Sequence, residues 1–201
     1  LVREHDVARV AWGDEVALTR RPPVQRMGRA EVVPPPGAFL QATPEGEAAL
    51  LAAVREAVKG ARHVVDLFAG CGTFALPLAE DMRVHAVEGD KGMTAALDKG
   101  WRMAEGLKHV THEARDLFMR GRLRVEGDLL VTTANNRLAG REGIDERIHQ
   151  KAGEELRAFT HLIAVERRKS NLQPCPVGQA VTTPGFNLPF DNLIHVVGPD
   201  C

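Results

Sequence analysis

A glycine-rich turn flanked by acidic residues is the part of this chain best suited to hold a small ligand. The apolar run Val64 to Phe68 contains Asp66 and leads into Ala69-Gly70-Cys71-Gly72, after which Thr73 to Glu80 can form a helix. A strand that turns into a helix through small residues presents backbone N–H groups to a ligand. Glu88 ends the next apolar run, close to the offset of about 20 residues at which an acid binds ribose hydroxyls. The pattern therefore predicts a nucleoside-binding site.

Asp66 indicates which nucleoside suits the turn. Ala75 lies three residues after Gly72, so the glycine pattern still permits a variant of the dinucleotide-binding loop. A carboxylate at the head of the turn favours the positively charged amino-acid end of S-adenosylmethionine over a pyrophosphate, because like charges repel. The remaining alternative is a tight strand-to-helix turn that binds nothing.

The elements that must position these residues alternate between strands and helices. Thr43 can cap a helix that has Pro44 in its first position and ends near Gly60. Further helices are predicted from Met93 to Trp101 and along Ile144, Ile148, Ala152 and Leu156, and the segment from Glu166 to Pro176 is predicted to be loop. Strands are predicted at Val64 to Phe68, Val84 to Val87, His109 to Glu113, Leu129 to Thr133, His161 to Val165 and Leu193 to Val197. The alternation predicts an α/β fold, a Rossmann-like three-layer sandwich with a mostly parallel sheet.

A short β-hairpin should precede this sandwich. Residues Val7 to Arg20 alternate loosely in hydrophobicity around Gly13-Asp14, which is typical of a hairpin turn. The prolines at 22–23 and 34–36 then predict an extended connector.

Four segments of the first part resemble RNA uracil-5-methyltransferases. They are Gly37-Ala38-Phe39-Leu40-Gln41, Asp66 to Thr73, His85-Ala86-Val87-Glu88-Gly89-Asp90 and Ala114-Arg115-Asp116-Leu117-Phe118. The resemblance covers residues 1–121 and implies that S-adenosylmethionine is bound there, with Asp116 near the adenine. The residues it assigns to the cofactor are Gln41, Asp66, Phe68, Gly70, Gly72, Glu88 and Asp116. Gln41 could instead cap the helix that begins near Thr43.

The residues that would transfer a methyl group are missing from the chain. The family that the first part resembles uses a cysteine in a Ser-Cys-Asn-Pro segment to attack carbon 6 of uracil, downstream of an Asp-Pro-Pro-Arg strand end. Neither segment occurs here. Cys71 lies within the glycine turn and is interpreted as a small packing residue. No catalytic residue is therefore assigned, and whether the chain is an enzyme stays open.

The remaining residues, 122–201, resemble the first half of a macro domain, a family that binds ADP-ribose. The resemblance lies in Asp128 to Gly153, in Cys175-Pro176-Val177-Gly178-Gln179-Ala180 and in Ile194-His195-Val196-Val197-Gly198-Pro199. It implies an alternative nucleotide site at Asn135, Gly140, Gly143, Ile144 and Asp145. A strand ending in an asparagine and followed by glycines can present amides to phosphates.

This second part departs from the macro-domain pattern. Thr132 stands where the family has its first asparagine, and Arg141-Glu142 interrupts the usual run of glycines. The family's upstream strand and its second phosphate loop are absent. His149 and His195 lie in strongly patterned elements and are interpreted as packing or surface residues.

Composition excludes several classes of protein. The 201 residues carry a formal net charge of −1, so an RNA partner would need a local basic patch. Three cysteines without a paired spacing predict neither a zinc site nor a disulfide framework and favour a cytoplasmic setting. No run is long and apolar enough for a membrane span. The candidate basic patches are Arg20, Arg21, Arg26 and Arg29, and Arg115, Arg120, Arg122 and Arg124.

Two incomplete α/β halves could complete one sheet. The sequence therefore favours a chimera that binds S-adenosylmethionine without turnover, with an ADP-ribose-binding module or a chain without ligand as alternatives. An unfinished sheet edge could also pair with a second copy to form a homodimer.

Overall fold

A six-stranded sheet with the order β7-β6-β5-β8-β10-β9 forms the centre of the computed structural model, which describes residues 5–12, 15–41, 43–117, 127–140 and 143–198. Every neighbouring pair in this sheet is parallel except β9 and β10. The mostly parallel α/β fold predicted from the sequence is confirmed. The strands are β5 (His63–Leu67), β6 (Arg83–Glu88), β7 (Val110–Ala114), β8 (Leu129–Thr133), β9 (Ala180–Pro184) and β10 (Asn192–Val196).

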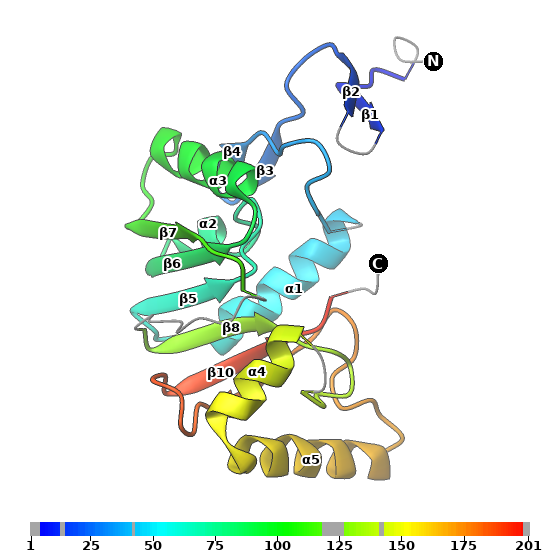
Figure 1. Ribbon diagram of the computed structural model, residues 1–201, viewed down its shortest axis with the longest axis vertical. Helices are drawn as coiled ribbons and strands as arrows, with labels where there is room; N and C mark the ends of the chain where they lie inside the picture. The colour runs from blue at the N-terminus through cyan, green and yellow to red at the C-terminus, as the bar shows by residue number, and fades with distance from the viewer. Residues whose placement is uncertain (1–4, 13–14, 42, 118–126, 141–142, 199–201) are drawn as a thin grey trace.

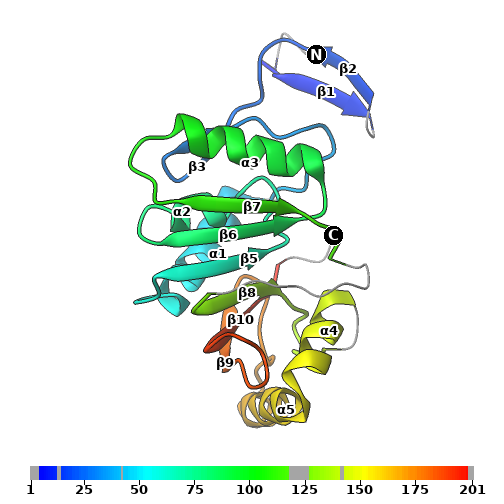
Figure 2. The ribbon, with the colours of Figure 1, turned by 60° about the vertical axis from the view of Figure 1, so that its left-hand side comes forward.

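Helices cover both faces of the sheet and make three layers (Figures 1 and 2). Leu50 and Leu97 pack with Val64 on one face, whereas Leu156 packs with Val65 on the other. Val64 and Val65 are neighbours whose side chains point to opposite faces, so a strand covered on both sides is a continuous apolar run. The helices of the first face are α1 (Pro44–Ala57), α2 (Ala75–Leu78) and α3 (Lys91–Met103), and those of the second are α4 (Gly143–Ala152) and α5 (Glu154–Lys169).

Two short hairpins precede the sandwich. The predicted hairpin is present as β1 (Arg9–Trp12) and β2 (Glu15–Thr19), and it projects away from the sheet (Figure 2). The expected extended connector is wrong over part of its length, because β3 (Gln25–Met27) pairs with β4 (Ala30–Val32). Strands of three residues are too short to show an alternating pattern, but Met27 and Val32 are buried and α3 packs on β4.

Capping fixes the beginnings of α1 and α3. Thr43 accepts a hydrogen bond from the N–H of Gly46 at 3.1 Å, and Pro44 follows in the first turn, as predicted. Asp90 caps α3 by accepting from the N–H of Met93 at 2.9 Å. Because Thr43 fills the cap position, the alternative interpretation of Gln41 as the cap of α1 is not supported.

The segment after α4 differs from the prediction. The single helix expected through Leu156 is two helices, because Gly153 has φ +96° and breaks the chain between Ala152 and Glu154. The strand predicted at His161 to Val165 and the first residues of the predicted loop belong to α5. Leu156, Thr160 and Ala164 are buried at intervals of four, which is helical spacing. The sequence prediction also missed β9.

The two parts of the chain meet where β5 pairs with β8. Val64, Val65 and Asp66 lie opposite Leu129, Leu130 and Val131 in parallel register. Asp128 holds the beginning of this pair, because its Oδ2 accepts from the N–H groups of Arg62 at 2.8 Å and His63 at 3.1 Å. The boundary expected between residues 121 and 122 lies outside the described residues. No helix in the described ranges is long and apolar enough to cross a bilayer.

Because both parts of the chain share one continuous sheet, we expect a core substitution in the second part to destabilise the first part as well. Leu193 is fully buried on β10, and we expect Leu193→Ala to lower the free energy of unfolding by about 2–5 kcal/mol. In a Trp12→Phe background, Trp101 on α3 is the remaining tryptophan, so its fluorescence reports the first part alone while circular dichroism reports both. Both signals should shift together in denaturant.

The matched control is Leu162→Ala on α5, where the leucine is 61% exposed and its loss should change the free energy of unfolding by less than about 0.5 kcal/mol. A Trp101 transition unchanged by Leu193→Ala, beside a shifted circular dichroism transition, would mean that the two parts unfold independently.

Candidate functional site

The carboxyl ends of the parallel strands form the edge where both sequence-predicted sites fall. The chain runs outward from β5 through β6 to β7 and then returns to β8 on the other side of β5. In α/β proteins, ligands bind at such a reversal of strand order, because the loops on either side of it diverge. Since β5 and β8 are paired and parallel, the turn after β5 and the loop after β8 begin at neighbouring strand ends.

The two glycines of the turn have different roles. Gly70 has φ +55°, and a Cβ atom added to it would meet nothing within 4 Å, so its backbone is open to a ligand. Gly72 has φ +100°, and a Cβ there would lie 2.7 Å from Cγ of Leu76. Gly72 is thus required for packing against α2. Phe68 also has a positive φ of 59° and packs against the apolar core on the face of the sheet that α4 and α5 cover.

Glu88 joins the end of β6 to this turn. Its Oε2 accepts a hydrogen bond from the N–H of Gly70 at 2.9 Å, and its Oε1 accepts from the N–H of Asp90 at 2.9 Å. A carboxylate has about four lone-pair positions, so two remain for other donors. The structure thus brings together the glycine and the acid that the sequence singled out.

Asp66 is a buried carboxylate beside the same turn. It is 1% exposed, and its Oδ2 has no hydrogen-bond partner within the described part of the chain. Burial raises the pKa of Asp66 to about 7; the negative charge of Glu88 acts in the same direction, whereas a hydrogen bond from the N–H of Ala75 opposes the rise. The turn therefore contains an acceptor that lacks a donor.

Asp116 and Gln41 are less closely tied to the turn. The chain leaves β7 beside Glu88, since the N–H of Arg115 donates to the carbonyl oxygen of Glu88 at 2.8 Å. A Cβ at Gly89 would lie 3.9 Å from Cα of Asp116, which places Asp116 at the same edge. Gln41 is half-buried in the segment that leads to α1.

The cysteines that the structure describes are core residues. Cys71 is 1% exposed and Cys175 is fully buried. Burial raises the pKa of each thiol to about 11, so little nucleophilic thiolate forms at neutral pH. The interpretation of Cys71 as a packing residue agrees with this placement.

The two candidate basic patches are partly neutralised by acidic neighbours. Arg20 and Arg21 both form ion pairs with Asp6, at 3.5 and 2.5 Å. Arg115 pairs with Glu113. Arg120, Arg122 and Arg124 lie outside the described residues.

The loop after β8 is held by its own side chains. Oδ1 of Asn135 accepts from the N–H groups of Arg137 at 3.0 Å and Ala139 at 3.4 Å. The N–H of Gly140 donates to Oδ2 of Asp145 at 3.1 Å. Gly143 begins α4, and the side chain of Ile144 lies outside the described part of the structure.

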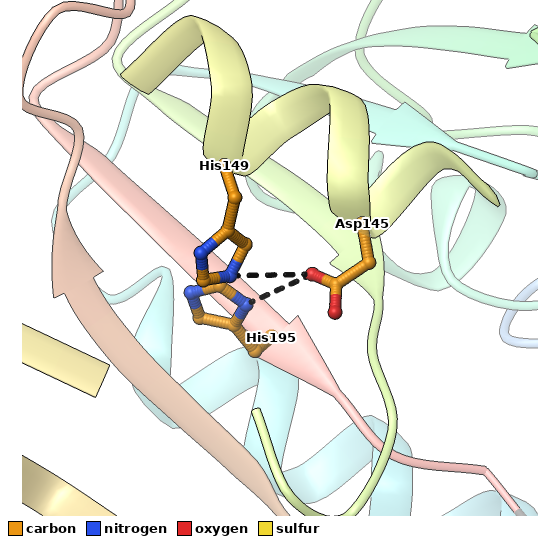
Figure 3. Close-up of side chains that lie close together, drawn as sticks. All are labelled: Asp145, His149 and His195. Atoms are coloured by element: carbon orange, nitrogen blue, oxygen red, sulfur yellow. Dashed lines mark ion pairs between the residues drawn. The ribbon is translucent and has the colours of Figure 1, made fainter. Parts of the chain in front are cut away.

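A cluster of three buried polar residues lies between α4 and the sheet (Figure 3). Oδ1 of Asp145 faces Nε2 of His149 at 3.6 Å and Nδ1 of His195 at 3.9 Å. Both histidines are fully buried. Burial lowers the pKa of both imidazoles and raises the pKa of the Asp145 carboxyl. The imidazoles are therefore neutral at pH 7.

From the sequence, His149 and His195 were interpreted individually as packing or surface residues. The fold places both of them beside Asp145. Asp145 and His149 are four residues apart on one helix and so share a face. His195 interrupts the otherwise apolar run of β10. The sequence did contain one signal, a titratable residue within a strand predicted to be fully buried. That signal could not show that α4 packs over β10.

Comparisons divide the chain in the same way. A family model for the macro domain matches residues 131–201. An uncharacterized RNA methyltransferase of Mesorhizobium japonicum is 53% identical over 113 residues, which are 56% of this chain and 27% of that protein, and the N-terminal part carries this likeness. An O-acetyl-ADP-ribose deacetylase of Escherichia fergusonii is 42% identical over 72 residues, 36% of this chain and 38% of that protein. The chain thus spans less than half the length of these curated relatives.

The fold likeness extends across both parts. The tRNA (uracil-54, C5)-methyltransferase of Pyrococcus abyssi, solved with S-adenosyl-L-homocysteine, superposes with a TM-score of 0.55 at 15% identity and covers 92% of this chain and 46% of that one. Coverage this high includes strands of the segment that matches the macro-domain model. The second part therefore follows a methyltransferase-like arrangement of elements while its sequence is similar to macro domains.

Burial of Asp66 predicts a specific pH dependence. The folded pKa of about 7 exceeds the ordinary value of 3.8, so the stabilisation by the protonated carboxyl is complete below about pH 4 and is lost as pH rises through about 7. Within that window, Asp66 should make the free energy of unfolding fall with a slope approaching about 1.4 kcal/mol per pH unit. Denaturant unfolding at about pH 5 and pH 8 measures the fall.

Asp66→Asn is the control, because an amide of the same shape does not titrate. The fall in free energy between the two pH values should be smaller in this variant than in the wild-type chain. Equal falls in both proteins would show that Asp66 has an ordinary pKa.

Proposed function

We propose that this chain binds S-adenosylmethionine at the carboxyl ends of β5 and β6. The observation that carries the proposal is the hydrogen bond between the N–H of Gly70 and the Glu88 carboxylate, which joins an open glycine turn to an acid. The N-terminal part resembles RNA methyltransferases, and the fold neighbour from Pyrococcus abyssi was solved with S-adenosyl-L-homocysteine. Both likenesses support this choice of ligand.

Glu88 is the group proposed to bind the ribose. Its two oxygens each accept one backbone hydrogen bond and retain capacity for the two hydroxyls of a ribose. The same backbone bonds fix the carboxylate in place before the ligand arrives, which reduces the entropy lost on binding. Asp116, at the adjacent end of β7, is proposed to lie near the adenine.

Asp66 is proposed to interact with the ammonium group of the cofactor's amino-acid end. Its buried Oδ2 lacks a donor, and a bound cation would both supply one and stabilise the charged form of the carboxyl. Gly70 lets that end of the cofactor approach the main chain, because no side chain stands there. The donor that Asp66 lacks is thus what the proposed ligand carries.

We further propose that the chain binds the cofactor without methylating uracil. Cys71 and Cys175 are buried and largely protonated, and the Ser-Cys-Asn-Pro segment is absent from the sequence. Residues 131–201, which match the macro-domain model, take up the remaining strands of the sheet. A chimeric origin accounts for this combination of two halves.

A second candidate ligand is ADP-ribose, bound at the loop after β8. The macro-domain match and the likeness to an O-acetyl-ADP-ribose deacetylase favour it. Asn135 follows β8 at the same sheet edge as the glycine turn. The amides of Arg137, Ala139 and Gly140 are already engaged within the protein, which leaves fewer donors for a diphosphate.

Calorimetric titration with S-adenosylmethionine, S-adenosyl-L-homocysteine and ADP-ribose tests both candidates. We expect heat from the first two ligands. Glu88→Ala should weaken their binding by about 1.5–3 kcal/mol, because charged hydrogen bonds to the ribose are lost. Glu105→Ala removes an exposed carboxylate after α3 and should leave the affinity unchanged.

The result that would overturn the leading proposal is binding of ADP-ribose alone. An affinity for S-adenosylmethionine that Glu88→Ala does not change would instead place the cofactor elsewhere on the chain. Circular dichroism of both variants confirms that they are folded.

Transfer of a labelled methyl group to uracil in RNA tests the second proposal separately. With saturating S-adenosylmethionine we expect no product above that of a protein-free control. Product formation that persists in a Cys71→Ser, Cys175→Ser, Cys201→Ser variant would reveal a nucleophile other than cysteine, and product lost in that variant would show that one of the three thiols reacts.

A further inference from the structure

The cluster between α4 and β10 is not used by the proposed cofactor site. We propose that Asp145, His149 and His195 bind a divalent transition-metal ion, with zinc as the ion that suits them best. Each residue offers one ligand atom, and the three atoms lie within 4.8 Å of one another. In Figure 3 the carboxylate of Asp145 points between the two imidazole rings.

The distances in the cluster are close to those of a metal site. Oδ1 of Asp145 is 3.6 Å from Nε2 of His149 and 3.9 Å from Nδ1 of His195. Zinc bonds to imidazole nitrogen and carboxylate oxygen are about 2.0–2.2 Å, so the ligand atoms of a tetrahedral site are about 3.3 Å apart. The three ligand atoms lie within 4.8 Å of one another, so the side chains would have to rotate to bring them to that separation around an ion.

The ligand atoms are buried without partners. In the described residues, the buried side-chain atoms that lack a hydrogen bond are Oδ1 of Asp145, both ring nitrogens of His149, Nδ1 of His195, and Oδ2 of Asp66. Native proteins leave few buried polar atoms unpaired, because each costs about 1–3 kcal/mol. Four of these five atoms belong to one cluster, and a cation between Oδ1 of Asp145, Nε2 of His149 and Nδ1 of His195 would pair three of them.

Neighbouring groups orient two of the three ligands. The N–H of Gly140 donates to Oδ2 of Asp145 at 3.1 Å, which leaves Oδ1 for the ion. Oγ1 of Thr183 lies 3.1 Å from Nε2 of His195, which directs Nδ1 toward Asp145. Hydrogen bonds of this kind to the outer atoms of ligands are typical of metal sites.

Gly140 makes room for the third ligand. A Cβ atom at this position would lie 2.2 Å from Cγ of His149, so only glycine permits the imidazole to stand where it does. Its φ of +55° also favours glycine. The loop after β8 is therefore shaped around the His149 ring.

The chemistry of the donors selects the ion. Two imidazole nitrogens and one carboxylate oxygen suit zinc and other late first-row ions, whereas calcium and magnesium prefer oxygen ligands. Three protein ligands with one open position are also the number found in zinc sites that keep a bound water.

The test is zinc uptake by the folded chain in a Cys201→Ser background, after dialysis against a chelator. We expect one zinc per chain by elemental analysis and titration against a colorimetric chelator, and visible absorption bands of four-coordinate cobalt when Co²⁺ replaces zinc. Asp145→Asn and His195→Asn should abolish the uptake. Thr183 does not contact the metal in the proposed geometry. Thr183→Val should still weaken zinc binding about 10–100-fold, because it removes the hydrogen bond that orients His195.

His85→Asn is the matched control. Nε2 of His85 lies 3.9 Å from Oε2 of Glu113, so this is another histidine next to a carboxylate. Replacing His85 should leave zinc uptake unchanged. The proposal is wrong if the wild-type chain takes up no zinc, or if Asp145→Asn and Thr183→Val, both folded by circular dichroism, bind it as the wild type does. A failure of S-adenosylmethionine to bind bears only on the cofactor proposal, because the cluster shares no residue with that site.

Discussion

The parallel pairing of β5 with β8 is the constraint on which the rest of the structure depends. Three register pairs join the methyltransferase-like part to the macro-like part, and Asp128 anchors their beginning through two backbone N–H groups. The hydrogen bonds also hold the pKa of the Asp128 carboxyl below its usual range. If β8 shifted by one residue along β5, Leu130 would exchange faces with Leu129 and Val131, and the apolar cores on the two faces of the sheet would no longer form.

Because every strand of that junction is parallel, all the loops with candidate ligand-binding residues emerge at one edge. The glycine turn follows β5, Glu88 ends β6, Asp116 follows β7 and Asn135 follows β8. Two nucleotide sites on separate domains would be independent of each other. On one edge, the turn after β5 and the loop after β8 start from paired strands, so the two candidate ligands would lie close to each other if both bound.

Patterns that repeat over a whole element were readable from the sequence. Helix α1 agrees with its prediction because its cap and its apolar spacing are local signals. The strands β5, β6, β8 and β10 agree because burial on both faces leaves mostly apolar runs. Short elements such as β3, β4 and β9 carry too few residues for a pattern. At the sites, Glu88 was found from its spacing to Gly70, but the meeting of His195 with Asp145 and His149 depends on how α4 packs over the sheet. That packing is a tertiary property that no local pattern contains.

Asp128 joins the two parts of the chain through main-chain donors. Its carboxylate accepts hydrogen bonds from two backbone N–H groups at the beginning of β5. These donors are present whatever the side chains at positions 62 and 63 are. The junction therefore recognises main chain rather than a particular sequence. A different α/β half that began with an acidic residue and an apolar strand could make the same two hydrogen bonds, because they require main-chain donors only.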